Sequence, residues 1–269
     1  MKKLKILFVT TEISPFFKVS NVADLVRKLP QGLQDKGHEI RILMPRFGLI
    51  SEKKNRLHDV VRLSGINITV GDEEKPLMIK VASIPGARLQ VYFLDNEDYF
   101  HRKAFLTHPE TNAWFDDNDE RCIFFCKGAL ETIKKLGWAP DIIHCHNFMT
   151  SLIPFYIKTI YKDEPVFKNT KVVYSLYNEN INYDFEYGES FKEKAAPEID
   201  PKLLEHFEKA DFLGITKGGI AYADAVTIGT PNISKELSAL IENKQKLEYV
   251  DVDDSCVETY NQFYTSLMN

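Results

Sequence analysis

The stretch Leu4-Lys5-Ile6-Leu7-Phe8-Val9, with the loop and helix that follow it, decides the fold of this chain. Its apolar run predicts a buried strand. The loop leads to Asn21, which is a competent N-cap for a helix. Apolar residues then recur at helical spacing, at Val22, Leu25, Val26 and Leu29. A buried strand followed by an amphipathic helix is typical of parallel α/β proteins.

The rest of the chain repeats this alternation, with one exception. Further strands are expected at Glu39–Met44, Asp141–His146, Lys171–Tyr177 and Ala225–Gly229, and further helices at Asp117–Gly137, Met149–Ile160 and from about Ile233. In between, Ile66–Val70, Leu77–Ile84 and Leu89–Leu94 predict strands with no helix between them. We therefore expect a single Rossmann-like, doubly wound, mainly parallel sheet with an antiparallel edge. Pro30 removes a backbone donor and is expected to kink or split the first helix.

The chain is expected to form one domain with a tail. Residues 1–231 contain no linker or repeat, and residues 232–269 are predicted to be a C-terminal helical tail docked on the same domain. Near 255–268 an amphipathic helix is indicated by Val257, Tyr260, Tyr264 and Leu267. This ending favours a natural stop over a piece cut from a longer enzyme.

Composition limits the function classes. The chain of 269 residues has 34 Lys and Arg against 39 Asp and Glu, a net charge of −5, which argues against nucleic-acid binding. No apolar run approaches the roughly 20 residues that span a bilayer. The first apolar run ends at Thr10, too early for a signal peptide. We expect a cytoplasmic protein that does not bind a membrane.

The four cysteines do not predict a metal site. None forms a C-x-x-C pair, and Cys122 and Cys126 stand at helical spacing, as buried apolar residues do. In His144-Cys145-His146 the two histidines would share one face of a strand and the cysteine would face the other way. We expect neither a metal nor another cofactor.

The loops after the strands are the expected binding region, because ligands of open parallel sheets bind at the carboxyl ends of strands. The first loop lacks glycine, so the dinucleotide fingerprint is absent. Lys18 precedes a helix N-terminus and is placed to hold an anion there. An ordinary surface lysine is the alternative.

Many short motifs occur in a familiar order between residues 5 and 227. They are Lys5–Val19, Ala23-Asp24, Leu29-Pro30, Lys36-Gly37-His38, Pro45–Gly48, Val91–Asn96, Asp117–Arg121, Leu136–His146, Asn169-Thr170 and Lys217–Thr227. Together they resemble the N-terminal part of bacterial glycogen synthases and plant starch synthases, whose first loop has the pattern Glu-x-x-Pro-Phe-x-Lys-x-Gly-Gly. No single motif is specific, but their number and order make a strong signal.

The resemblance implies half of a GT-B fold, in which two Rossmann-like domains face each other across a cleft. It also implies an enzyme family that moves glucose from ADP-glucose or UDP-glucose to an α-1,4-glucan, with retention and without a metal. This chain resembles only the N-terminal, acceptor-side domain. The family's C-terminal domain supplies most of the nucleotide-sugar site, including an Arg/Lys pair and a glutamate, and none of it is present here.

The resemblance also implies site residues. The positions matched to ligand-binding residues are Lys18, Asp24, Asp95, Asn96, His146 and Asn178, with Lys18 at the donor-phosphate lysine. The positions that depart from the family are Ser20, Asn21, Asn147, Phe148, Met149 and Tyr177. Ser20-Asn21 replaces a glycine pair, and a side chain there fills space that glycine leaves for a ligand. An acid, an indole and two histidines of the family are also replaced, at Asn147, Phe148, Met149 and Tyr177, and Thr230-Pro231 stands for Ser-Pro.

Simpler interpretations of single residues stay open. Asp95 and Asn96 can close a turn, Arg121 can pair with a neighbouring acid, and Tyr177 can fill the space of a lost ligand.

These features predict a glycogen synthase-like, single-domain protein that lacks glucosyl transfer on its own, with no catalytic residue assigned. It would act by binding a protein partner, or a sugar or nucleotide ligand. Any nucleotide affinity should be weak, and Lys18→Ala should lower it further. The alternative is the N-terminal half of a split or truncated glycosyltransferase whose other domain is a separate chain.

A missing second domain would leave one wall of the cleft facing water. Phe16, Phe17, Phe148, Met149 and Tyr177 would make that wall apolar. Exposed apolar patches mark interfaces, so we expect a homodimer or a protein partner at this face.

Overall fold

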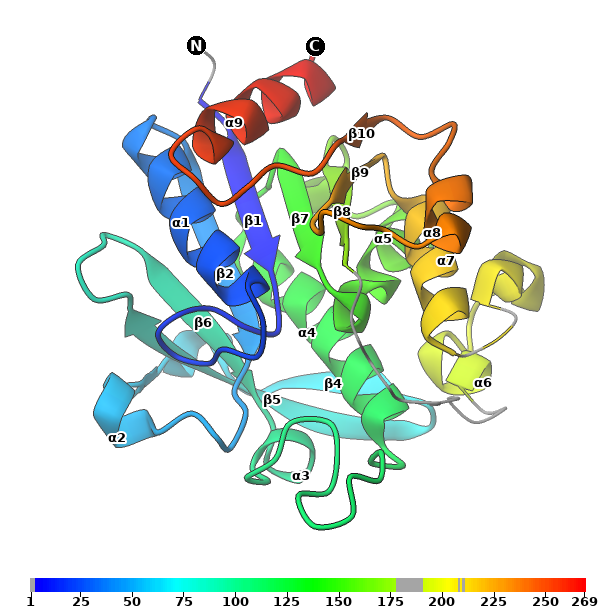
Figure 1. Cartoon of the computed structure of the whole chain (residues 1–269). Coiled ribbons are helices and arrows are strands. Elements are labelled where there is room, and N and C mark those ends of the chain that lie inside the picture. Colours follow the sequence, from blue (N-terminus) through cyan, green and yellow to red (C-terminus); the bar gives the residue numbers. More distant parts are fainter. Residues whose placement is uncertain (1–2, 178–190, 208, 210) are drawn as a thin grey trace.

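The computed structural model describes residues 3–177, 191–207, 209 and 211–269 (Figure 1). The strands are β1 (Lys5–Val9), β2 (Glu39–Pro45), β3 (His58–Asp59), β4 (Ile66–Val70), β5 (Glu73–Ser83), β6 (Gln90–Asp95), β7 (Ile142–His146), β8 (Lys171–Leu176), β9 (Ala225–Ile228) and β10 (Lys246–Leu247). The helices are α1 (Val22–Asp35), α2 (Glu52–Asn55), α3 (Glu97–Phe100), α4 (Asn118–Leu136), α5 (Leu152–Lys158), α6 (Phe191–Ala195), α7 (Phe212–Tyr222), α8 (Lys235–Leu240) and α9 (Cys256–Leu267). Short 3-10 helices lie at Val61–Leu63, Phe148–Thr150, Pro165–Phe167 and Pro201–Phe207. Within the described ranges, no helix combines the length and the apolar character needed to cross a membrane.

One sheet organises the molecule. Its strand order is β10-β9-β8-β7-β1-β2-β6-β5-β3, and β4 pairs with β5. Neighbours from β10 to β6 run parallel, whereas β5 runs antiparallel to β6, β3 and β4. The predicted α/β fold, a mainly parallel sheet with an antiparallel edge, is confirmed.

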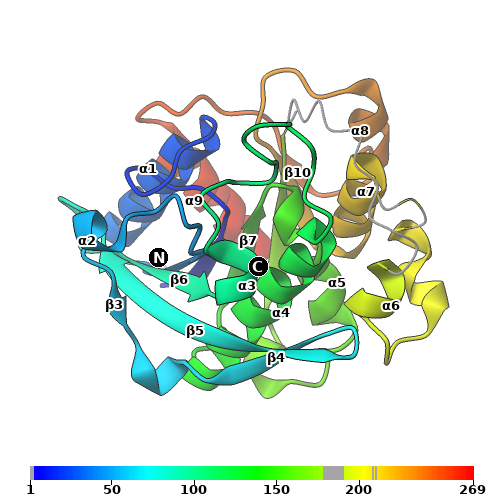
Figure 2. The ribbon, with the colours of Figure 1, turned by 90° about the horizontal axis from the view of Figure 1, so that it is seen from below.

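Helices cover both faces of the parallel strands, which explains the unbroken apolar run of β1. The helices α1 and α9 lie side by side on one face, and α4, α5 and α7 lie on the other (Figures 1 and 2). Ile6 to Val9 are fully buried as a result. A strand buried on both faces is apolar throughout instead of alternating.

The strand order reverses between β1 and β7. The strands β2 to β6 all lie on one side of β1 in the sheet. After α4 the chain crosses to the other side of β1, where β7, β8, β9 and β10 follow in order. The loops that follow β1 and β7 therefore leave in opposite directions, and a crevice opens between them at the carboxyl ends of the strands.

Several sequence predictions of helices are wrong in detail. Pro30 lies inside α1 without splitting it, because the buried neighbours Val26, Leu29 and Leu33 pack that turn onto the sheet and offset the lost hydrogen bond. Asn21 precedes α1, but its side chain makes no cap. Instead, the Ser20 hydroxyl accepts a hydrogen bond from the Val22 amide at 3.1 Å.

Other helix boundaries also moved. The segment expected as one helix from Met149 to Ile160 begins as a 3-10 turn and ends earlier, because α5 stops at Lys158. The helix expected from Asp117 is α4, and Gly137 ends it in the left-handed region with φ 59°.

The tail lies along α1. The sequence predicts a helix near residues 255–268, and α9 spans Cys256–Leu267. Ion pairs join Lys28 to Asp254 (2.9 Å) and Lys36 to Glu258 (2.5 Å). Val257 lies so close to Gly32 that a side chain there would overlap it. Small size at Gly32 lets the two helices meet.

Two buried histidines hold the inner face of α9. His38 accepts a hydrogen bond from the Leu4 amide at Nδ1 (3.1 Å), so its Nε2 donates to the Asn261 Oδ1 (2.8 Å). His144 Nδ1 lies 2.6 Å from the Tyr264 hydroxyl, and its Nε2 lies 2.7 Å from the Ser175 hydroxyl. The tail is therefore bonded into the sheet through imidazole rings.

We predict that stability falls on mild acidification. Burial lowers the pKa of His144 well below its ordinary 6.5 and lowers the pKa of His146 to about 3. Below about pH 6.5 the unfolded chain binds protons at both rings and the folded chain does not, so the free energy of unfolding falls by about 1.4 kcal/mol per pH unit for each histidine. Urea unfolding between pH 7.5 and 5 measures this. A curve that is flat over this range would contradict the prediction.

Candidate functional site

A cavity of about 700 Å³ lies at the carboxyl ends of β1, β7, β8 and β9. Its walls are Thr11-Glu12, residues 19–22, Asp24-Leu25, Phe105-Leu106, Asn147-Phe148, Tyr177, Gly229–Pro231, Tyr249-Val250, Val252 and Tyr260. The cavity coincides with the crevice where the strand order reverses. Its outer wall comes from the tail, through Tyr249, Val252 and Tyr260.

The Glu12 carboxylate accepts hydrogen bonds from the backbone amides just before α1. Oε2 accepts hydrogen bonds from the amides of Val19 (2.8 Å) and Ser20 (2.7 Å), and Oε1 accepts one from the Ser20 hydroxyl (2.6 Å). Amides that precede a helix are a common binding place for phosphate. In this chain a buried carboxylate already fills that place, and Ser20 adds a bond to it that glycine could not make.

Lys18 faces an acid instead of the cavity. Its Nζ lies 2.6 Å from the Asp24 carboxylate, which also accepts a hydrogen bond from the Ser14 hydroxyl (2.8 Å). The hydrogen bond from Lys18 is the main cause that lowers the pKa of Asp24. Lys18 is half exposed and does not line the cavity, whereas Asp24 does.

Asn147 lies in the cavity wall with a strained backbone. It has φ 65°, a conformation that residues other than glycine rarely adopt, and its Nδ2 donates to the Thr11 hydroxyl. Its Oδ1 is buried and has no hydrogen-bond partner among the described residues. A buried amide oxygen without a partner is rare in folded proteins.

Tyr177 fills space beside Asn147. Its hydroxyl lies 2.7 Å from His146 Nδ1, and its ring lies over Gly229, where any side chain would overlap it. The interpretation of Tyr177 as a space-filling residue agrees with this position. His146 is fully buried behind Tyr177 and does not line the cavity.

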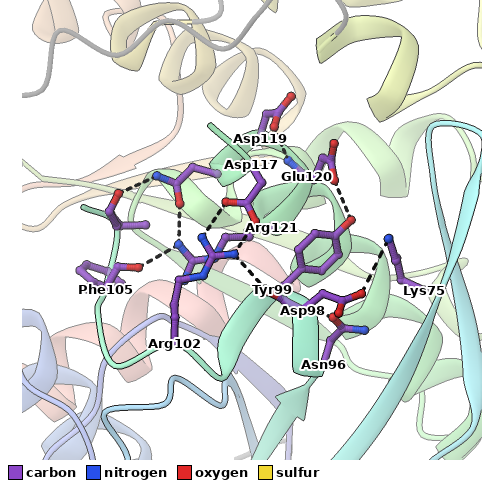
Figure 3. Close-up of polar contacts among 12 residues, drawn as sticks. Lys75, Asn96, Asp98, Tyr99, Arg102, Phe105, Asp117, Asp119, Glu120 and Arg121 are labelled. Atoms are coloured by element: carbon purple, nitrogen blue, oxygen red, sulfur yellow. Dashed lines mark hydrogen bonds and ion pairs between the residues drawn. The ribbon is translucent and has the colours of Figure 1, made fainter. Parts of the chain in front are cut away.

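The start of α4 fixes another wall (Figure 3). Arg121, fully buried among aromatic rings, donates to the Phe105 carbonyl at 2.8 Å and to the Asn118 Oδ1 at 2.5 Å. Asn118 donates in turn to the Leu106 carbonyl at 2.8 Å. The Phe105 carbonyl and the Asn118 side-chain amide are thus two of the partners of Arg121. This motif positions the Phe105-Leu106 wall.

Two predicted ligand positions lie elsewhere and one is not described. Asn96 caps α3, because its Oδ1 accepts from the Tyr99 amide at 3.1 Å, and its Nδ2 donates to the Pro76 carbonyl at 2.9 Å. Burial raises the pKa of Asp95, which lies 3.0 Å from His101. Neither residue lines the cavity, and the turn-closing interpretation fits Asn96. Asn178 lies outside the described residues.

The expected apolar wall is not exposed. Phe16, Phe148, Met149 and Tyr177 are buried, and Phe17 is partly buried against Phe47 and Phe105. The premise of an exposed apolar face at these five residues is therefore wrong, because they pack inward. A homodimer or partner at this face stays a prediction.

The cavity is acidic and aromatic. Glu12 and Asp24 are the charged residues in its described lining, and no lysine or arginine belongs to that lining. Aromatic rings come from Phe105, Phe148, Tyr177, Tyr249 and Tyr260. Sequence reasoning missed the tail residues and Phe105. Across the described part of the chain, no three His, Cys, Asp or Glu side chains gather to hold a metal ion.

Comparisons with known proteins agree with this architecture. Residues 5–250 match the family model of the starch synthase catalytic domain. A glycogen synthase of Chlorobaculum parvum is 35% identical over 239 residues, which are 88% of this chain and 48% of that protein. One of Chlorobium luteolum is 44% identical over 177 residues, which are 66% of this chain and 36% of that protein. The chain thus spans about half the length of the curated relatives it matches, or less.

A solved structure shows the same fold. The catalytic domain of starch synthase IV from Arabidopsis thaliana, bound to ADP and acarbose, matches with a TM-score of 0.76 at 20% identity. The match covers 94% of this chain and 52% of that chain. The architecture is that of one half of a GT-B glycosyltransferase.

We predict that Gly229→Ala destabilises the protein through Tyr177. The added methyl group must displace the ring and disturb its bond to His146, which should cost about 1–3 kcal/mol of unfolding free energy. In a Tyr177→Ala background the same change should cost close to nothing. Urea unfolding of the two single variants and the double variant measures the coupling. Additive effects would show that the ring does not lie over Gly229.

Proposed function

The chain belongs to the starch synthase catalytic domain family, and on that premise we propose that it binds a saccharide in the cavity and does not transfer glucose on its own. The single observation that carries the proposal is the charge of the lining: two carboxylates and no cation among the described residues.

The described part of the cavity lining offers no free phosphate site, which argues against a nucleotide sugar as the main ligand. A diphosphate needs cations or free amides at a helix N-terminus. The Val19 and Ser20 amides are already bonded to Glu12, and the Lys18 ammonium is bonded to Asp24. A diphosphate in this cavity would lie near two carboxylates without a compensating charge.

The remaining chemistry suits an uncharged ligand with many hydroxyl groups. Sugar hydroxyls donate to carboxylates, and Glu12 and Asp24 bring two of them to the lining. The apolar face of a sugar ring packs on aromatic rings such as that of Tyr249, which is partly buried at the cavity wall. The Arabidopsis catalytic domain is bound to both ADP and acarbose, and it is the acarbose that resembles the ligand proposed for this chain.

The same lining supports the proposed lack of transfer. Removing one preorganised donor from a transition state commonly costs about 10²–10³ in rate. A departing diphosphate would meet no stabilising cation in the described lining of this cavity. We therefore propose a binding function, that of a pseudoenzyme, for the isolated chain.

A second candidate rests on length. Because the chain covers 48% of the Chlorobaculum parvum protein, it can also be one half of a two-chain glycosyltransferase. Purification of the tagged protein from its own cells decides this point. A co-purifying chain that resembles the second half of these relatives, together with transferase activity of the pair, would support the enzyme.

We predict saccharide binding that depends on the tail. Isothermal titration with maltotetraose should show saturable binding, and Tyr249→Ala should weaken it about two- to tenfold, the worth of one aromatic contact. Leu49→Ala, at an exposed residue outside the cavity, is the matched control and should bind like the wild type. Absence of maltotetraose binding, or tighter binding of ADP-glucose than of maltotetraose, would overturn the proposal.

The purified chain should also fail to elongate glycogen. With radiolabelled ADP-glucose or UDP-glucose, incorporation should not exceed that of a heat-killed control. Incorporation above that control would refute the proposed lack of transfer without touching the saccharide site.

A further inference from the structure

A second cavity, of about 350 Å³, lies at the opposite edge of the sheet. Its lining includes Glu39 and Arg41 at the start of β2 and Gln90 at the start of β6. Arg88, in the turn that precedes β6, also belongs to it. Because β2 and β6 run parallel, these residues gather at the amino-terminal edge of both strands. The large cavity lies at the carboxyl ends, so the two sites are separate.

Arg41 is held ready by aromatic rings. Its guanidinium lies over the rings of Trp138 (5.0 Å) and Tyr92 (5.7 Å) from the centroids, and it donates to the Tyr92 hydroxyl at 2.8 Å. Its Nε is buried without a partner, and the ion pairs among the described residues do not include Arg41, so a ligand would meet the two outer nitrogens of the guanidinium. Stacking and one hydrogen bond fix the orientation of the cation while leaving part of its donor fork for a ligand.

Arg88 supplies a second cation from a firmly held turn. The turn is closed by a hydrogen bond from the Ile84 amide to the Leu89 carbonyl (2.9 Å). Arg27 of α1 donates to the Pro85 carbonyl in the same turn at 3.2 Å. Arg88 itself is exposed, and in the described structure it makes no ion pair with a carboxylate.

The remaining polar groups favour a negative ligand. The Ser83 hydroxyl and the Gln90 amide add donors to the same lining. Glu39 is the one acid there, and it is compensated, because it accepts a hydrogen bond from the Trp138 Nε1 and lies 4.0 Å from the Lys3 ammonium. Two arginines, a hydroxyl and an amide thus face a small volume with little opposing charge.

We propose that this cavity binds a small phosphate monoester, with Arg41 as the bidentate contact and Arg88 closing over the anion. A planar guanidinium forms two parallel hydrogen bonds with a phosphate, which makes the pairing both strong and directional. The volume admits a phosphate with a small substituent and is half that of the saccharide cavity. The site is independent of the proposed saccharide binding.

The experiment uses the full chain and two probes, inorganic phosphate and methyl phosphate, at constant ionic strength held with chloride. Amide chemical shifts in ¹⁵N-labelled protein are followed during each titration. Saturable shifts should appear at Ser83 and Gln90 and not at Asn147 or Gly229. Methyl phosphate should bind at least as tightly as inorganic phosphate, because the cavity has room for a small substituent beside the phosphate.

Three variants make the test specific. Arg88→Gln, at an exposed position, should weaken binding at least fivefold without affecting the fold. Arg41→Lys should weaken it at least tenfold, because an ammonium keeps the charge and loses the fork. Arg62→Gln removes an exposed arginine outside this lining and should bind like the wild type.

Four outcomes would overturn the proposal. Shifts that rise linearly without saturation, or that are equal in all variants, mean an adventitious ion only. Shifts centred on Val19 and Ser20 would place the anion in the large cavity instead. Tighter binding of inorganic phosphate than of methyl phosphate would exclude the ester. Unchanged affinity in Arg88→Gln would overturn it even if Arg41→Lys failed to fold.

Discussion

The reversal of strand order between β1 and β7 is the constraint on which the rest of this structure depends. The loops that follow the paired strands β1 and β7 leave in opposite directions, so no local turn can cover the gap between them. The gap must be walled by segments distant in sequence. Here these are Phe105-Leu106, held by Arg121 and Asn118 of α4, and the tail around Tyr249 and Tyr260. The cavity is therefore a product of the whole chain and not of one motif.

The tail forms one wall of the cavity, and its helix α9 is held in place by contacts to the sheet. Tyr260 and Tyr264 are one turn apart on α9, and the first lines the cavity while the second bonds to His144. Buried polar contacts of this kind are strong only when every partner is present. Both ring nitrogens of His144 have hydrogen-bond partners, the hydroxyls of Tyr264 and Ser175, so α9 has one well-defined position on the sheet. The position of the outer wall thus depends on a neutral histidine beneath it.

The fold could be predicted from the sequence to a large extent, and the site only in part. Apolar periodicity depends on burial, which is why β1, α4 and the antiparallel edge were located correctly. The position of the carboxyl ends followed from strand direction. Charge pairing could not be predicted: that Lys18 bonds to Asp24, and that Glu12 reaches the Val19 amide, depends on the loop conformation. The packing direction of Met149 was missed for a related reason: it was expected in the first turn of an α-helix, whereas it lies in a 3-10 helix, which turns its side chains differently.

The distribution of charge distinguishes this chain from what its backbone alone would suggest. The carboxyl ends of parallel strands, with a helix starting nearby, normally attract anions through the helix dipole and free amides. At the start of α1 those amides are bonded to Glu12, and Asp24 stands in the first turn, where it favours the helix electrostatically. The helix therefore gains from carboxylates what a bound phosphate would otherwise contribute. The start of α1 therefore has less to gain electrostatically from a bound anion, because carboxylates of the same chain already supply the negative charge.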